Sequence, residues 1–470
     1  MRITSNRFES FESRHSLFEL HVDNIPIWER VRHQVFRKIK QQNGTGQAHT
    51  RIKQTPRKYI KRAWLDLKNI LYKNPFLSSK HRYLFIGHPR RKKRQDGNWW
   101  DIYCDPIHNE SDFDYIHLEP HHLLEHRQPS QTENIRYLDT IDFGKSIQLL
   151  LNINNVTIPR PIRQNLNEAK KTIDEQFNAK IDLIDIVQRN LHIRHARLWM
   201  YHQLLDRIDP EIVVLVVSYG KETLIEACKN KKIPVVELQH GLIHDAHFGY
   251  SYRGDRTKKM FPDYLLTWGD FWTNSVKFPI PGDRIMSMGY PYLEQTAQQY
   301  EDVQSKDQLL FISQGTIGER LSKFALKVEQ YPEINYDVMY KLHPGEYDRW
   351  REEYPWLVDA DFEVIDSSEP SLYQLFAESS AQIGVGSTAV YEGLLFDLET
   401  YVYGCPGSEI LQPLVAENSA EIVSSVQELA GKLGTGSERF DRDRYFAPNA
   451  TERICTFLDN LCDSEMNTDI

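Results

Sequence analysis

One histidine in this sequence stands where proton-transfer chemistry is expected. His240 follows the apolar residues 234–238, which predict a buried strand, and Gly241 comes directly after it. Glycine lets the backbone bend sharply beside a substrate, and a neutral imidazole can take a proton from a hydroxyl group near neutral pH. A single histidine is more often a hydrogen-bonded structural residue, but the carboxyl end of a strand favours a general base. We therefore predict that His240 is catalytic.

The same segment also allows a metal-binding interpretation. His240, His244 and His247 would share one face of a continuous helix, but Gly241 disfavours a helix that begins there. The five cysteines form no CxxC pair, and no other cluster of Cys and His supports a zinc site. We therefore expect no metal.

A polar loop in the second half of the chain is a candidate anion site. It follows the apolar residues 309–313 and precedes a predicted helix, and it contains Ser313, Gln314, Gly315 and Thr316. Unpaired backbone N–H groups at such a helix start can bind a phosphate group. No Gly-Lys-Ser/Thr follows, so the loop is not a Walker A motif, which speaks against an ATPase.

Two further segments carry groups suited to a nucleotide. Lys341 and His343 end a predicted strand, where Pro344 turns the chain; the alternative for His343 is an ordinary exposed loop histidine. Ser387 or Thr388 is expected to cap a helix whose positive end favours phosphate.

Glu392 lies one turn after Thr388, so it faces the same side and could accept hydrogen bonds from a ribose diol. The alternative is an ordinary helix cap with a solvated glutamate.

Short apolar runs alternate with helical stretches along most of the chain, and this alternation predicts two doubly wound parallel α/β domains. A chain of 470 residues also exceeds what one core supports. We expect a helical basic extension over residues 1–80 and a helix over 436–470 that returns to the first domain. Between them we expect a domain over 81–291 that holds the acceptor of a transferred group and a domain over 307–435 that holds its nucleotide-activated donor. Open α/β sheets bind ligands at the carboxyl ends of their strands, so we expect the site in a cleft there.

Charge is distributed unevenly. Residues 1–100 hold 23 basic and 7 acidic side chains, although the whole chain has a net charge of -9. The acidic remainder argues against a general nucleic-acid binder. Within the basic part, an amphipathic helix is expected over residues 51–73. It either packs on the domain or lies on an anionic membrane face.

A second basic feature follows the predicted strand at residues 83–87. We expect this run to steer an anionic acceptor, the alternative being a solvated loop. It consists of Arg90, Arg91, Lys92, Lys93 and Arg94.

The motifs over residues 211–414 resemble those of the two-domain (GT-B) transferases of bacterial surface-polymer synthesis, including capsule polysaccharide transferases, polysialyltransferase-like enzymes and teichoic acid glycerophosphotransferases. Gln239-His240-Gly241 resembles the His-Gly element whose histidine is the base, and Lys341-Leu-His343-Pro344 is similar to the motif whose histidine contacts the donor phosphate. Gly386-Ser387-Thr388 with Glu392 is similar to the helix start that completes the nucleotide site.

By the same resemblance, Ser313–Thr316 corresponds to the first donor loop. Residues 366–371, ending in Ser371, correspond to the loop near the base. The histidine element lacks the Trp-His-Gly-Thr form of the glycerophosphotransferases, so glycerol phosphate is not the expected transferred group.

We predict from this an inverting, metal-independent glycosyltransferase that needs no cofactor besides its nucleotide-sugar co-substrate. The resemblance favours a CMP- or CDP-type donor, and a glycan or lipid-linked acceptor in surface polysaccharide synthesis. Two alternatives stay open. One is a UDP-sugar 2-epimerase, which predicts a tight core of acidic cleft residues near the histidine, where only Glu237 and Asp245 qualify. The other is a non-catalytic glycan- or nucleotide-binding subunit. No signal peptide or long apolar span stands out, so we expect a cytoplasmic location, with the basic amphipathic helix as a membrane contact.

Overall fold

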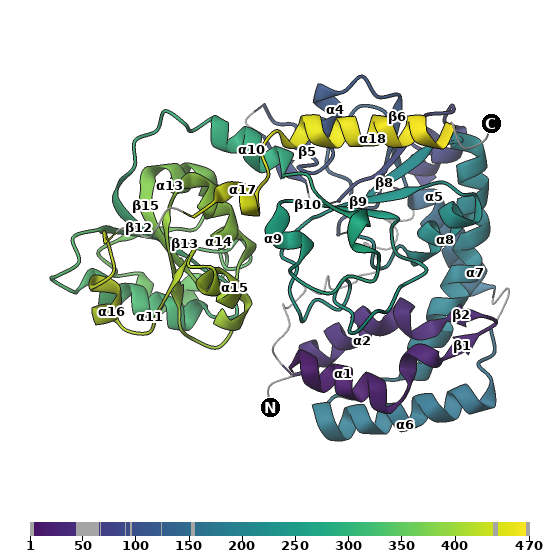
Figure 1. The fold of residues 1–470 in the computed structure, drawn as a ribbon, viewed down its shortest axis with the longest axis horizontal. Coiled ribbons are helices and arrows are strands. Elements are labelled where there is room, and N and C mark those ends of the chain that lie inside the picture. The colour runs from purple at the N-terminus through teal and green to yellow at the C-terminus, as the bar shows by residue number, and fades with distance from the viewer. Residues whose placement is uncertain are drawn as a thin grey trace. The chain divides into compact units, whose positions relative to one another are not determined.

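The structure is a computed structural model that describes residues 4–43, 65, 67–89, 91–94, 96–123, 125–151, 156–435 and 440–466. The chain forms two compact units (Figure 1). Unit 1 consists of Met1–Pro291 and Asn449–Ile470, and unit 2 is Tyr292–Pro448.

Unit 1 is built on a seven-stranded parallel sheet with the strand order β11-β10-β9-β8-β3-β6-β7. Its strands are β3 (Tyr83–Ile86), β6 (Tyr115–Glu119), β7 (Ile135–Tyr137), β8 (Ile212–Val216), β9 (Val235–Leu238), β10 (Tyr264–Thr267) and β11 (Ile285–Ser287). Every residue of β3, β6, β8 and β9 is buried, which is typical of parallel strands covered on both faces.

Alternate residues of these strands face two different helical layers, as the pleat requires. Leu84 and Ile86 pack with α7 (Leu183–Ile208) and α8 (Glu222–Asn230). Phe85 packs on the other face with α4 (Asp105–Glu110) and α18 (Ala450–Met466). The final helix α18 therefore belongs to the core of unit 1, where it lies beside α4 (Figure 1).

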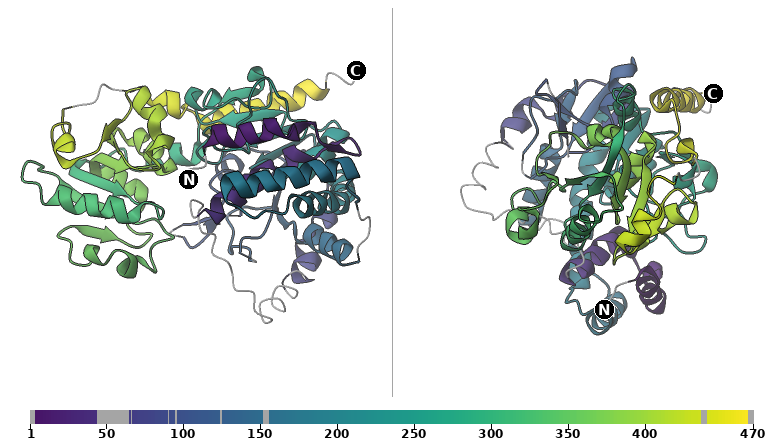
Figure 2. Two further views of the ribbon diagram at one scale, coloured as in Figure 1. Left: turned by 90° about the horizontal axis from the view of Figure 1, so that it is seen from below. Right: turned by 90° about the vertical axis from the view of Figure 1, so that its left-hand side faces the viewer.

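The N-terminal segment forms a helical layer of unit 1, although a separate extension was expected over residues 1–80. Helices α1 (Ser5–Arg14), α2 (Ile27–Gln42) and α6 (Arg160–Phe177) lie side by side in both views of this region (Figures 1 and 2) and share one hydrophobic core with the start of α7. A buried ion pair joins Arg32 of α2 to Glu12 of α1. Most of the amphipathic helix expected over residues 51–73 lies outside the described residues, so that prediction remains untested.

Unit 2 is built on a six-stranded parallel sheet with the order β14-β13-β12-β15-β16-β17. Its strands are β12 (Lys306–Ile312), β13 (Asp337–Lys341), β14 (Glu363–Ile365), β15 (Ser379–Gly384), β16 (Glu399–Tyr403) and β17 (Glu421–Val423). The connecting helices include α11 (Gly318–Glu329), α13 (Leu372–Glu378), α14 (Thr388–Gly393) and α16 (Val426–Ala430). The short edge strand β17 was not predicted.

The smaller elements complete the described chain. They are β1 (His21–Val22), β2 (Ile25–Pro26), β4 (Lys92–Lys93), β5 (Trp99–Trp100), α5 (Asp139–Leu150), α9 (Asp270–Thr273), α10 (Pro291–Gln298), α12 (Trp350–Glu353), α15 (Gln412–Ala416) and α17 (Arg442–Tyr445). No helix among the described residues is long and apolar enough to cross a membrane.

The two units confirm the predicted fold class, because each is a doubly wound parallel α/β domain of the kind that makes up the GT-B fold. The strand order of each sheet runs in both directions from its first strand. In unit 1 the order reverses between β3 and β8, and in unit 2 it reverses between β12 and β15. Ligands of open α/β sheets bind at the carboxyl ends of the strands beside such a reversal, so these loops are the places to look for a site.

Candidate functional site

His240 follows β9 and is held between two tyrosines. Its Nδ1 lies 3.2 Å from the hydroxyl of Tyr250, and its Nε2 lies 3.2 Å from the hydroxyl of Tyr219. The Tyr250 hydroxyl donates its proton to Oε1 of Glu237, so it can only accept a hydrogen bond from Nδ1–H of His240. This places the lone pair of the neutral ring on Nε2, where it accepts a hydrogen bond from the Tyr219 hydroxyl and is the atom that a general base would use.

Glu237 is the buried end of this hydrogen-bonded chain. Its side chain points from β9 into the protein, and Oε1 also accepts the backbone N–H of Ser218 at 2.8 Å. Burial raises the pKa of Glu237, while the hydrogen bonds from Tyr250 and Ser218 lower it. Because Glu237 is fully buried, it acts on His240 through Tyr250. The sequence signal was a carboxylate inside an apolar strand, since such a charge needs a buried partner.

The turn after β8 lies on the other side of His240. Val217 has a φ of 70°, which is a strained conformation for a β-branched residue. The buried ammonium of Lys221 donates to the carbonyl oxygens of Val216 at 2.7 Å and Val217 at 2.6 Å. Burial lowers the pKa of Lys221 to about 8, against the opposing charge of Glu237. This turn positions Tyr219 against Nε2 of His240.

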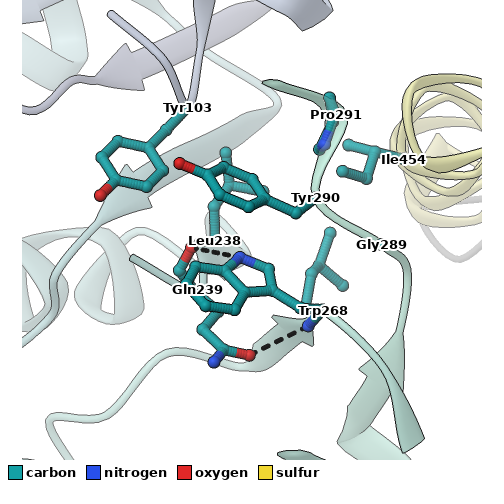
Figure 3. A pocket seen from close by; sticks show the side chains of 9 residues that line it. Tyr103, Leu238, Gln239, Trp268, Gly289, Tyr290, Pro291 and Ile454 are labelled. Atoms are coloured by element: carbon teal, nitrogen blue, oxygen red, sulfur yellow. Dashed lines mark hydrogen bonds between the residues drawn. The ribbon is translucent and has the colours of Figure 1, made fainter. Parts of the chain in front are cut away.

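Aromatic residues surround the end of β9 that precedes His240; Figure 3 shows Tyr103, Trp268 and Tyr290 around Leu238 and Gln239. The Tyr103 hydroxyl donates to the carbonyl oxygen of His240 at 2.7 Å, and Nε1 of Trp268 donates to that of Gln239 at 3.1 Å. The ring of Tyr290 stacks on Trp268 with centroids 4.6 Å apart. The hollow among these side chains measures about 10 Å³, which is room for a single water molecule. We therefore infer that the side chains around this hollow support the His240 loop.

In unit 2, the predicted nucleotide loops come from neighbouring strands. The Ser313–Thr316 loop follows β12, His343 follows β13, Ser371 lies beyond β14, and Ser387 follows β15. These four strands are adjacent in the order β14-β13-β12-β15. A Cβ on Gly386 would lie 3.6 Å from Oε1 of Gln314. The Ser313–Thr316 loop and the segment before Ser387 therefore meet at the point where the strand order reverses.

A buried carboxylate joins the first loop to the His343 turn. Glu346 is completely buried and accepts three hydrogen bonds, from the hydroxyls of Ser313 (3.2 Å) and Tyr354 (2.8 Å) and from the backbone N–H of His343 (2.9 Å). Glu346 was missed at the sequence level, because nothing in its spacing distinguishes it from an exposed loop glutamate. Glu346 therefore connects the Ser313–Thr316 loop to the His343 turn, two segments that were predicted separately.

His343 is exposed at this turn, and its tautomer is defined. Nδ1 accepts the backbone N–H of Gly345 at 3.0 Å, so Nε2 carries the proton of the neutral ring and is a hydrogen-bond donor. Lys341 was expected to offer a hydrogen-bond donor to the nucleotide, but its ammonium is engaged within the protein. Its ammonium donates to the carbonyl oxygens of Ser367 at 2.6 Å and Pro370 at 3.0 Å, and burial lowers its pKa to about 8.

Two of the predicted hydroxyls cap helices. Ser387 accepts the backbone N–H of Ala389 at 3.2 Å at the start of α14. Ser371 accepts that of Gln374 at 3.1 Å at the start of α13. These bonds hold the two helix starts in place.

Glu392 is held one turn after the start of α14. The Tyr373 hydroxyl donates to its Oε2 at 2.9 Å. The glutamate is half-buried, and its carboxylate is therefore oriented by a residue of the neighbouring helix α13. Tyr373 was not among the predicted site residues.

The basic run separates into buried and exposed parts. Arg91 is buried, with its guanidinium paired to Glu119 and Asp105 and bonded to the Thr132 hydroxyl at 2.8 Å. The structure thus contradicts a solvent-facing role for Arg91, because its charge is neutralised inside unit 1.

The neighbours of Arg91 differ from it. Lys92 and Lys93 form the exposed strand β4, and Arg94 is exposed over the ring of Trp100 at 4.2 Å. These three remain candidates for acceptor binding, and Arg90 lies outside the described residues.

One group of buried side chains has the composition of a metal site. Ligand atoms of Asp101, Cys104 and His117 lie within 4.8 Å of one another. Oδ2 of Asp101 already accepts the backbone N–H of His88 at 2.9 Å. Burial raises the pKa of the Cys104 thiol and lowers that of His117. Both groups are therefore in their neutral forms near pH 7, and a metal would have to displace the thiol proton.

Comparison with known proteins gives distant matches only. No family model matches the chain, and no curated protein matches it. Among solved structures, the UDP-GlcNAc 2-epimerase from Methanocaldococcus jannaschii is 13% identical, covering 80% of this chain and 99% of that one, with a TM-score of 0.47. The epimerase from Rickettsia bellii is 11% identical, covering 83% and 98%, with a TM-score of 0.46.

A structure of the wall teichoic acid polymerase TagF soaked with CDPG is 11% identical, covering 88% of this chain and 100% of that one, with a TM-score of 0.42. Likeness at this level carries no argument about activity or substrate.

Proposed function

We propose that this protein is an inverting, metal-independent glycosyltransferase that transfers a sugar from a nucleotide donor to a hydroxyl of a glycan or lipid-linked acceptor in surface polysaccharide synthesis. The observation that carries the proposal is the Glu237–Tyr250–His240 chain of hydrogen bonds, which leaves Nε2 of His240 as the proton acceptor. A CMP- or CDP-type donor is the preferred co-substrate.

In the proposed reaction, Nε2 of His240 takes the proton of the acceptor hydroxyl as its oxygen attacks the anomeric carbon of the donor sugar. The bond from that carbon to the donor phosphate oxygen breaks on the opposite face, so the configuration inverts and the nucleotide leaves with the electron pair. The imidazolium that forms is stabilised through Nδ1–H by Tyr250 and the carboxylate of Glu237.

Unit 2 is proposed to bind the donor nucleotide. The Nε2–H of His343 and the N–H groups at the start of α14 would stabilise the charge that builds on the leaving phosphate. Ser313, Gln314, Gly315 and Thr316 would form the rest of the phosphate loop. Glu392, oriented by Tyr373, would accept hydrogen bonds from the ribose.

A thermal-shift series with CMP, CDP, UDP and GDP tests the donor part, because a ligand that binds only the folded state stabilises it increasingly as its concentration exceeds Kd. We expect one cytidine nucleotide to raise Tm most, and equally in wild type and His240→Ala. The variant should lose sugar transfer by about 100-fold or more. Failure of every nucleotide to shift Tm would refute the donor site, and full transfer by His240→Ala would refute the base.

A further inference from the structure

A second cavity lies inside unit 1, next to His240 but outside the site described above. Its volume is about 280 Å³, slightly below the range of roughly 300–1,000 Å³ that holds drug-sized ligands. It is therefore large enough for one or two sugar rings. One wall is α2, which contributes Glu29, His33 and Arg37 at a spacing of four residues, so that the three lie along one helix face.

The opposite wall is the Tyr219-Gly220 turn after β8, at the strand-order reversal of unit 1. Gly220 has a φ of 84°, and a Cβ built on it would meet no atom within 4 Å, so the turn faces open space. The Tyr219 ring lies 4.4 Å from the His33 ring, and its hydroxyl lies 3.2 Å from Nε2 of His240. One side chain thus separates the cavity from the candidate base.

The polar groups of the cavity fall into two kinds. Two of its cations are already paired, since Lys258 lies 3.1 Å from Glu222 and Arg30 lies 3.5 Å from Glu226. Their charges are balanced within the protein, so they shape the wall and do not call for a ligand.

Three other groups on α2, those of Glu29, His33 and Arg37, differ from these two cations. Oε2 of Glu29 and Nδ1 of His33 are buried without a hydrogen bond, and Arg37 makes no hydrogen bond or ion pair to any residue that the structure describes. Burial lowers the pKa of His33 to about 4, so the ring is neutral near pH 7. A buried polar atom left without a partner costs roughly 1–3 kcal/mol, which a bound ligand would recover.

We propose that this cavity binds an anionic sugar unit of the acceptor, with its carboxylate or phosphate at Arg37 and its ring hydroxyls at Glu29 and His33. A hydroxyl donor suits the carboxylate of Glu29, an anion suits the guanidinium of Arg37, and the rings of His33 and Tyr219 offer faces for a sugar ring. The proposal rests on the proposed function in one respect only: the bound unit is the acceptor because the cavity adjoins His240.

Direct binding tests it, with glucuronate, glucose 6-phosphate, glucose and inorganic phosphate as probes, by calorimetry or ligand-observed NMR. We expect one or both anionic sugars to bind the wild-type chain more tightly than glucose and inorganic phosphate do. Arg37→Gln should weaken that binding roughly tenfold, the effect of one charge-assisted hydrogen bond. Lys38→Gln is the matched control: it removes the same charge from the next residue of α2, which is exposed as Arg37 is but does not line the cavity. It should change Kd less than twofold.

The two anionic probes separate a carboxylate from a phosphate ligand. Glu29→Gln separates a sugar from a bare anion, because it should weaken binding of the sugars and leave inorganic phosphate unchanged. The proposal is overturned if neither anionic sugar binds, if Arg37→Gln and Lys38→Gln behave alike, or if inorganic phosphate binds as well as the sugars.

Failure here is distinguishable from failure of the proposed function. If a nucleotide raises Tm but sugar binding does not depend on Arg37, the cavity proposal is refuted and the transferase proposal stands. Arg37-dependent sugar binding without any nucleotide effect would keep a sugar site and remove the transferase.

Discussion

Nδ1 of His240 lies 3.2 Å from the hydroxyl of Tyr250. Because that hydroxyl donates its own proton to Glu237, the bond has one possible direction, and it defines which nitrogen of His240 can accept a proton. The tautomer of a histidine after a buried strand is thus set by a tyrosine ten residues further along the chain.

Replacing Tyr250 with Phe tests this relationship. The ring nitrogen Nδ1 then loses its acceptor, and Glu237 keeps only the N–H of Ser218 on Oε1. We expect kcat to fall by about 10- to 100-fold, because the imidazolium is no longer stabilised, with the nucleotide Kd unchanged. Steady-state kinetics and calorimetry measure the two quantities. A kcat equal to wild type would show that the tyrosine is only structural, and an equal loss in kcat and nucleotide affinity would point to misfolding.

Substituting Gly318 with Ala tests how tightly the donor loop is built. A Cβ there would lie 2.3 Å from the Tyr354 hydroxyl and 2.5 Å from Oε1 of Glu346, and both atoms are engaged in a hydrogen bond to one another. Overpacking of this kind costs typically 1–3 kcal/mol. We expect a lower Tm and weaker nucleotide binding in a thermal-shift titration.

Gly282→Ala provides the control, since a Cβ at Gly282 meets no atom within 4 Å. Equal stability of the two variants would contradict the close packing between the Gly318 helix start and Glu346.

The basic run can be divided by mutation. Arg91→Gln leaves Glu119 and Asp105 buried without their cation, and breaking a buried ion pair in this way costs roughly 3–5 kcal/mol. Lys93→Gln changes an exposed residue of β4 and should alter the free energy of unfolding by less than about 0.5 kcal/mol. Urea denaturation of both variants measures the difference. If Arg91→Gln were as stable as Lys93→Gln, the buried pairing of Arg91 would be wrong.

Stability should fall as the pH is lowered below about 6.5. Burial lowers the pKa of His244 to about 4, with Lys40 adding to the effect. Between pH 6.5 and 4 the unfolded chain therefore binds a proton at this position that the folded chain does not, which favours unfolding. At pH 5 this difference amounts to about 2 kcal/mol.

His244→Asn removes that contribution, so its loss of unfolding free energy between pH 7 and pH 5 should be smaller than that of wild type by up to about 2 kcal/mol. Denaturant titrations at both pH values measure it. Other histidines, including His33 and His108, titrate in the same direction and keep part of the slope. An identical slope in the variant would contradict the lowered pKa.

Local pattern was sufficient for every strand of the two large sheets except β17, and for the loops that carry the candidate site residues. The apolar run at residues 234–238 predicted β9, and of the two expected caps of α14, Ser387 and Thr388, the structure shows Ser387. Both depend on residues close in sequence, because periodicity and capping are local properties. β17 escaped prediction because a three-residue strand carries too little pattern.

The residues that direct the chemistry depend on contacts between distant segments. Sequence alone singled out His240, but only the fold gives its Nδ1 the Tyr250 hydroxyl and its Nε2 the Tyr219 hydroxyl. Likewise, Glu346 was indistinguishable from a surface glutamate until the structure buried it beneath Ser313.

The basic charge of the N-terminal part also shows what the sequence and the tertiary structure each determine. Composition established that the first hundred residues are strongly basic, but it could not distinguish a cation paired inside the protein from one available to a ligand. Packing decided it: Arg91 is enclosed by carboxylates from later strands and helices, whereas Arg37 of α2 lines a cavity with Tyr219. Burial and pairing of a charge depend on which segments meet, and that is a property of the tertiary structure alone.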